Sequence, residues 1–271
     1  MFGTGLIVFR ETLEAALFVG IVAAATRTVP NRTRWLMLGA VAGMLGSLLM
    51  ATAMEQISNL ANGLGQDLVN VVILSVALLM LTWHTLWVST HAKEMTDDAK
   101  RLGANASQGV GSLWAVALAV AMTVLREGAE TVLFVAGLAS GSTEGIATLM
   151  LSATLGFLLG VAAGWLIYSG LGQVQPRRLF AITNVLILML AGNLASQLAR
   201  TLQQADWLQW LSERAWDSSA WLTNDSLFGM VLHGVIGYDA SPSQLQVLFY
   251  LLSIVLISSA ARHMRLRSTS A

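Results

Sequence analysis

The sequence predicts an all-α membrane protein with seven transmembrane helices, and two properties of the chain carry this prediction. Of its 271 residues, 55% are hydrophobic and 11% are charged, and the mean hydropathy is +0.67. Soluble domains carry about 25% charged residues. The chain also contains seven apolar stretches, each long enough to cross about 30 Å of hydrocarbon as a helix. Because these stretches are continuous rather than alternating, helices are favoured over a closed β-barrel.

The predicted helices follow one another along a single membrane domain that covers residues 1–271. In chain order they cover about 3–25, 35–54, 68–90, 113–139, 146–171, 179–199 and 245–261. Most connections between them are short. The longest, about 200–243, precedes the last helix and contains four tryptophans among acidic residues. Tryptophans are typical of the headgroup level of a bilayer, so we expect an interfacial helix there, with an acidic vestibule for cations as the alternative.

The charges of the connections predict the orientation of the chain. Basic residues gather in every second connection and in the C-terminal tail: Arg27, Arg32, Arg34, Lys93, Lys100, Arg101, Arg177, Arg178, Arg262, Arg265 and Arg267. The other connections are mainly acidic. Since basic connections stay in the cytoplasm, we expect the N-terminus outside and the C-terminus in the cytoplasm. Lys93 to Arg101 should then form a solvated cytoplasmic loop.

Two of the apolar stretches contain the same charged pattern, Arg-Glu-x-x-Glu. It reads Arg10-Glu11-Thr12-Leu13-Glu14 in the first helix and Arg126-Glu127-Gly128-Ala129-Glu130 in the fourth. A charge in hydrocarbon costs roughly 2.5–3.5 kcal/mol on insertion scales, and intramembrane ionisable residues usually mark an ion or substrate path. The six charged residues of the two motifs are therefore the candidate site.

The two copies of the motif also predict an internal repeat. The copies lie in the first and fourth helices, an offset of three helices, and an odd offset reverses the direction of the chain. We therefore expect two inverted repeats, about 1–92 and about 110–200, with the last helix as an addition. In this architecture the substrate site lies near the bilayer midplane, where the repeats meet.

The spacing within each motif indicates cation chemistry. The arginine and the second glutamate are four residues apart and share a helix face, so they can pair. Two facing motifs would bring together four carboxylates and two guanidiniums, a cage of oxygen atoms that suits a hard cation. Two alternatives remain at this point, namely structural salt bridges between helices and a proton relay without metal.

Several functions are disfavoured by what the chain contains. It has no cysteine, which rules out disulfides and thiolate ligands, and its net charge of zero suggests no nucleic-acid partner. It has no H-E-x-x-H and no G-x-S-x-G pattern, so we expect a transporter rather than an enzyme. His84 in the third helix and His233 before the last helix are left open. A structural role is favoured for His84, with the ion path as the alternative.

The motif residues carry a resemblance. RETLEAALFVG and LREGAETVLF, together with MLTWHTLWV and SLFGMVLHGVIGY, resemble the oxidase-dependent iron transporter family of fungal high-affinity iron permeases and bacterial EfeU-type permeases. The resemblance implies an iron permease of the bacterial plasma (inner) membrane, with iron as substrate and no permanently bound cofactor. Manganese or lead is the alternative cargo. It implies Glu11, Glu14, Glu127 and Glu130 as iron ligands, supported by Arg10 and Arg126. It further implies periplasmic partners, a haem peroxidase and a cupredoxin-containing protein.

Overall fold

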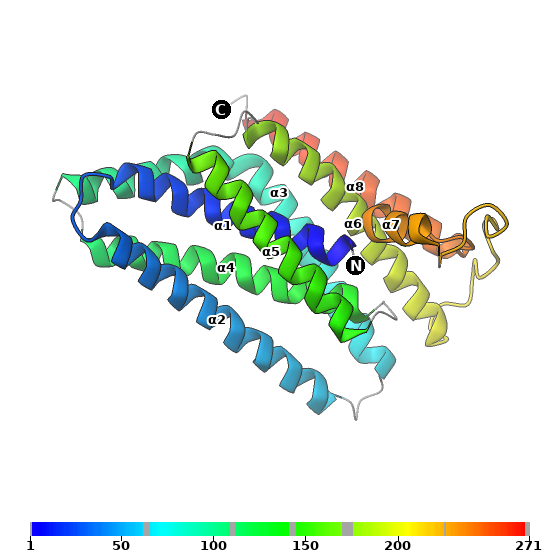
Figure 1. Cartoon of the computed structure of the whole chain (residues 1–271). Helices are drawn as coiled ribbons and strands as arrows, with labels where there is room; N and C mark the ends of the chain where they lie inside the picture. Colours follow the sequence, from blue (N-terminus) through cyan, green and yellow to red (C-terminus); the bar gives the residue numbers. More distant parts are fainter. Residues whose placement is uncertain are drawn as a thin grey trace.

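The structure is a computed structural model that describes residues 2–61, 66–108, 112–140, 145–169, 176–224 and 226–268. Within these residues the chain is a bundle of helices without named strands (Figure 1). The helices are α1 (Phe2–Ala25), α2 (Arg32–Ala61), α3 (Gln66–Ser107), α4 (Leu113–Ser140), α5 (Ile146–Tyr168), α6 (Pro176–Gln204), α7 (Leu227–Ile236) and α8 (Gln244–Ser268). The three prolines of the chain, Pro30, Pro176 and Pro242, lie between helices or at the first residue of one, where no helical N–H is lost.

Each of the seven predicted apolar stretches forms a helix, and five of these helices are long and apolar enough to cross a membrane. The five are parts of α2, α3, α5, α6 and α8. The chain is therefore a helical, multi-pass membrane protein. The motif helices α1 and α4 are not among the five. Each carries three charged side chains within its apolar run, which is the physical reason that composition alone does not identify it as a span.

The third helix is much longer than the sequence predicted, and the expectation that residues 93–101 form a loop is wrong. α3 continues through this segment to Ser107. Ala99 and Ala106 of the extension are buried against Val22 of α1 and Val120 of α4. These small apolar residues give the extension a face that packs on the bundle, and this face outweighs the local charges. The end predicted at Leu171 for the fifth helix lies outside the described residues.

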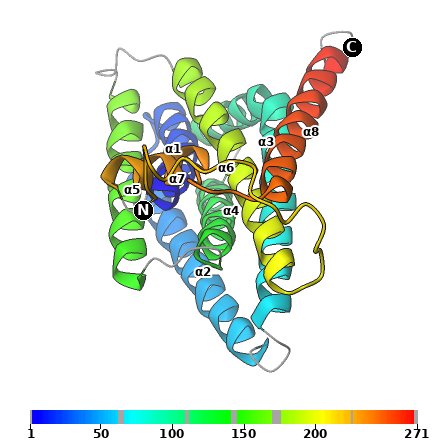
Figure 2. The same ribbon diagram turned by 90° about the vertical axis from the view of Figure 1, so that its right-hand side faces the viewer.

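The segment between α6 and α8 also differs from its prediction, because its tryptophans do not lie on a helix. Residues 205–224 are irregular, and the short helix α7 contains no tryptophan. The segment folds back through an isolated bridge between Arg214 and Ser243 and a 2.8 Å bond from the Ser218 N–H to the Ala240 carbonyl. α7 lies across the bundle beside the N-terminus of α1 (Figures 1 and 2).

Glycines bring the motif helices close to their neighbours. α1 packs along α5, and α4 packs along α2. A Cβ atom built on Gly160 of α5 would lie 2.7 Å from the Thr12 Cβ and 2.8 Å from the Phe9 carbonyl oxygen of α1. In the other pair, a Cβ atom on Gly128 of α4 would meet the Ser47 hydroxyl of α2. Since only glycine leaves room for these approaches, the glycine stripes hold the charged helices inside the bundle.

We expect Gly160→Ala to lower the free energy of unfolding by about 1–3 kcal/mol, because overpacking a tight contact forces the helices apart. Thr12→Gly should restore part of the loss, since it removes one of the two clashing groups. Thermal unfolding of the solubilised protein measures both. Gly145→Ser is the matched control, because a Cβ atom at Gly145 would meet nothing within 4 Å. Equal melting temperatures for wild type and Gly160→Ala would contradict the tight approach.

Two apolar cores lie on either side of the motif residues along the helix axes. One core contains Ile7, Leu81 and Phe134 together with residues of α6 and α8. The other contains Val22 and Val120 together with residues of α2 and the extension of α3. Along α1, α3 and α4 alike, the charged residues lie between the two cores. The site is therefore closed along the helix axes by packed apolar side chains.

Candidate metal site

The structure brings the two motifs together around a histidine from a third helix. α1 supplies Arg10, Glu11 and Glu14, α4 supplies Arg126, Glu127 and Glu130, and α3 supplies His84. Apart from Arg126, which is 36% exposed, all of these side chains are at least nine-tenths buried in the bundle. The predicted meeting of the motifs is thus present in the fold.

The first motif is held by its own arginine. The terminal nitrogens of Arg10 lie 2.7 Å from Glu11 Oε1 and 2.8 Å from Glu14 Oε1. Arg10 is 0% exposed, so water cannot replace either partner. Charge-assisted pairs of this length are the strong ones, and Arg10 is shared between its two glutamates, so that the motif keeps one surplus negative charge.

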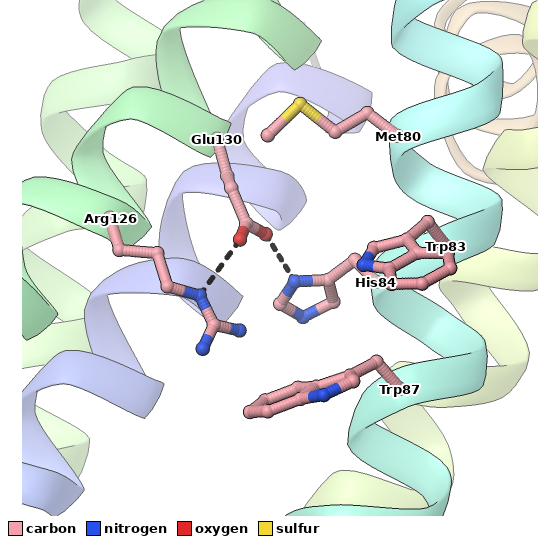
Figure 3. A pocket seen from close by; sticks show the side chains of 6 residues that line it. All are labelled: Met80, Trp83, His84, Trp87, Arg126 and Glu130. Carbon is pink, nitrogen blue, oxygen red and sulfur yellow. Dashed lines mark hydrogen bonds and ion pairs between the residues drawn. The ribbon is translucent and has the colours of Figure 1, made fainter.

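The second motif is held differently. Arg126 approaches its glutamates through Nε, which lies 3.1 Å from Glu130 Oε1 and 3.7 Å from Glu127 Oε1. Its guanidinium carbon stands 4.5 Å from the centre of the Trp87 ring, within the range of a cation–π contact. Figure 3 shows the terminal nitrogens of Arg126 turned away from Glu130, towards Trp87.

His84 connects the two motifs. Its Nδ1 contacts Glu130 Oε2, and its Nε2 lies 3.7 Å from Glu14 Oε2. The sequence analysis favoured a structural role for His84, with the ion path as the alternative, and the structure places His84 between glutamates of both motifs. The signal in the sequence was its position within an apolar span, but nothing there indicated which residues it would contact.

The cluster has the donors of a metal site. One ligand atom from each of Glu11, His84, Glu127 and Glu130 lies within 4.8 Å of the others. Glu11 Oε2 and Glu127 Oε2 are buried and have no hydrogen-bond partner among the described residues. A buried carboxylate oxygen without a partner is costly, and a cation between the helices would satisfy both. Three carboxylates and one imidazole suit a first-row divalent ion.

Glu14 is the one predicted ligand outside this group. It remains within the cluster through Arg10 and His84. Whether it ligates the ion stays a prediction.

A cavity of about 230 Å³ opens beside the cluster between α3 and α4. Its lining residues are Met80, Trp83, His84, Trp87, Arg126 and Glu130 (Figure 3). Glu130 and His84 therefore face both the cluster and the cavity. Met80 and Trp87 are lining residues that the sequence analysis missed, because only the packing of α3 on α4 selects them from the other apolar residues of the span.

A comparison with protein families decides the relationship of the chain. Residues 1–262 match the iron permease FTR1 family. The chain belongs to this family. This permease is 30% identical over 262 residues to the "Ferrous iron permease EfeU" of Escherichia coli O6:H1, with 94% of this chain and 93% of the relative covered. It is 30% identical over 263 residues to the protein of the same name from Yersinia pestis, with 94% and 91% covered. No solved structure matches the chain.

The family places the cluster in a membrane transporter that carries iron, rather than in an enzyme. His233 lies apart from this cluster, near the end of α7. Its Nδ1 is 2.7 Å from the Tyr238 carbonyl oxygen, so it joins α7 to the turn that follows. Gly237 in that turn has a φ of 73° and closes α7 with the bond from the Tyr238 N–H to the Leu232 carbonyl.

Proposed function

We propose that the permease moves ferrous iron through the buried cluster formed by its two Arg-Glu-x-x-Glu motifs. The observation that carries the proposal is the group of four ligand atoms within 4.8 Å of one another. Two of the four residues, Glu11 and Glu127, each have a buried oxygen with neither a hydrogen bond nor an ion pair among the described residues. The relatives are named ferrous iron permeases, and an imidazole among carboxylates fits a divalent first-row ion. Iron is cargo in this proposal, and no resident cofactor is needed.

We assign the ligand role to Glu11, Glu127, Glu130 and His84, with Glu14 as a further ligand once the ion has arrived. Arg10 and Arg126 reduce the repulsion among the four carboxylates of the empty site. The charge balance of the cluster also argues against the alternative of a structural salt-bridge network. Two arginines leave a surplus of two carboxylates, whereas a structural salt-bridge network would gain from neutrality.

The proposed architecture is two inverted repeats with seven spans, in which α1 and α4 also cross the membrane. Support comes from the packing of the motif helices. Thr12, the third residue of the first motif, meets Gly160 of α5, the second helix of the other repeat. Gly128, the third residue of the second motif, meets Ser47 of α2, the second helix of the first repeat. In the first contact the larger residue, Thr12, is on the motif helix and the glycine is on its neighbour. In the second contact the glycine, Gly128, is on the motif helix, so the two helix pairs pack equivalently. The charged side chains of α1 and α4 pair with one another inside the bundle, and this pairing keeps them away from lipid.

We further propose that the N-terminus faces outward and the C-terminus faces the cytoplasm. Reporter fusions after Arg34 and Arg101 should give cytoplasmic signals, and fusions near Asp217 should give an external signal, because basic connections are retained inside. An external signal at Arg34 combined with a cytoplasmic signal at Asp217 would reverse the orientation. The proposed location is the inner membrane of a bacterium, where periplasmic partners such as a haem peroxidase and a cupredoxin-containing protein would oxidise or deliver iron.

Uptake of radiolabelled iron by vesicles that contain the purified whole chain tests the function. Iron should accumulate, and manganese or lead should compete only if the site accepts them. Anomalous scattering at the iron edge from crystals soaked in iron should place the ion between α1, α3 and α4. Vesicles that take up no iron above the level of empty vesicles would contradict the proposal.

A further inference from the structure

The two arginines of the equivalent motifs are held in different ways, and the difference lies in a residue outside both motifs. Arg10 is enclosed and forms an ion pair with each glutamate of its motif through a separate terminal nitrogen. Arg126 is 36% exposed, and its guanidinium lies on the Trp87 ring at the rim of the cavity. Trp87 belongs to α3 and lies three residues after His84, so the two side chains share one side of the helix.

The position of Arg126 affects how strongly the second motif can bind a cation. A guanidinium about 4 Å from a divalent ion would repel it by several kcal/mol near a protein surface. A guanidinium bonded to both glutamates would also occupy the oxygens that the ion needs. In the structure the closest approaches of Arg126 to Glu130 and Glu127 are 3.1 Å and 3.7 Å, whereas those of Arg10 to Glu11 and Glu14 are 2.7 Å and 2.8 Å. The second motif is therefore less compensated than the first.

We propose that Trp87 is a positioning residue that holds the guanidinium of Arg126 at the rim of the metal site and thereby keeps Glu127 available to arriving iron. The indole face supplies an attraction that competes with the two carboxylates for the guanidinium. The cavity beside Glu130 supplies the space in which the guanidinium lies. This inference rests on the proposed function and adds that the second motif is the side on which the ion arrives.

The test compares iron binding and uptake by Trp87→Leu, Trp87→Phe and wild-type protein. Leucine keeps apolar bulk but has no π face, so Arg126 should fold onto its glutamates. We expect the dissociation constant for ferrous iron and the KM for uptake to rise about fivefold to tenfold, with the maximal rate retained. Phenylalanine keeps a π face and should restore binding to within about twofold of wild type. Equilibrium dialysis of the purified whole chain with radiolabelled ferrous iron gives the dissociation constants.

Trp165→Leu is the matched control, because Trp165 of α5 is 60% exposed, does not line the cavity and is not the tryptophan on which Arg126 stacks. It should bind iron as wild type does. In an Arg126→Gln background, Trp87→Leu should cause no further change, since the group that it positions is gone. A loss that persists in this background, or a wild-type affinity in Trp87→Leu, would overturn the inference. Glu127→Gln separates failure of this inference from failure of the proposed function. If the cluster does not bind iron, Glu127→Gln will bind iron as tightly as wild type.

Discussion

Replacing Glu127 with glutamine should reduce iron uptake by about 100-fold or more, because even groups that only support metal ligands cost 10- to 100-fold when they are removed. Glutamine keeps the shape of the side chain but cannot act as an anionic ligand. Glu127 carries a buried carboxylate oxygen that has neither a hydrogen bond nor an ion pair among the described residues, and so does Glu11 of the opposite motif. We expect the same loss from Glu11→Gln. Initial rates of uptake into vesicles, at matched amounts of inserted protein, measure both.

The double variant with both glutamates replaced should be little worse than either single variant. Groups that act as a unit are strongly non-additive, and one ion bound between two helices is such a unit. Glu213→Gln is the control of identical chemistry, because Glu213 is exposed in the segment between α6 and α8. If the losses from the two single variants multiplied in the double variant, the glutamates would act at separate places along the path. Near-normal uptake by both single variants would rule out the central site.

Arg10→Lys should destabilise the protein as well as impair uptake. Lysine keeps the charge but not the planar fork, so one ammonium must replace two nitrogens that lie 2.7 Å and 2.8 Å from different glutamates. One buried carboxylate then loses its partner, and this costs about 1–3 kcal/mol. Thermal unfolding of the solubilised protein should show the loss, and uptake at matched expression should fall at least about tenfold.

Arg126→Lys is the comparison that separates the two arginines. Because Arg126 is partly exposed and approaches its glutamates through Nε, lysine can replace more of its contacts. We expect uptake to fall while the melting temperature stays within about a degree or two of wild type, as for other partly exposed pairs. Equal destabilisation by both substitutions would show that the difference between the two arginines has no energetic consequence. Full uptake by both would show that only the net charge of the site matters.

Features that depend on residues close together in the sequence were predicted correctly, whereas several features that depend on contacts between distant segments were not. The helices were predictable because an apolar run satisfies its own backbone hydrogen bonds, wherever the rest of the chain lies. The pairing of Arg10 with Glu14 and of Arg126 with Glu130 was predictable for the same reason, since residues four apart share a helix face. The extension of α3 was not, because it depends on Ala99 and Ala106 packing against helices that are distant in sequence.

By itself, the sequence determined that this is a helical membrane protein with two equivalent charged motifs, since composition, helix length and four-residue spacing are local properties. Only the tertiary structure decided which atoms meet at the site. It places His84 between Glu14 and Glu130, leaves one oxygen each of Glu11 and Glu127 unpartnered, and lays Arg126 on Trp87. These contacts join α1, α3 and α4 and depend on glycines that set how closely the motif helices approach their neighbours. Motifs that are equivalent in sequence therefore differ in the fold, because each faces different neighbours.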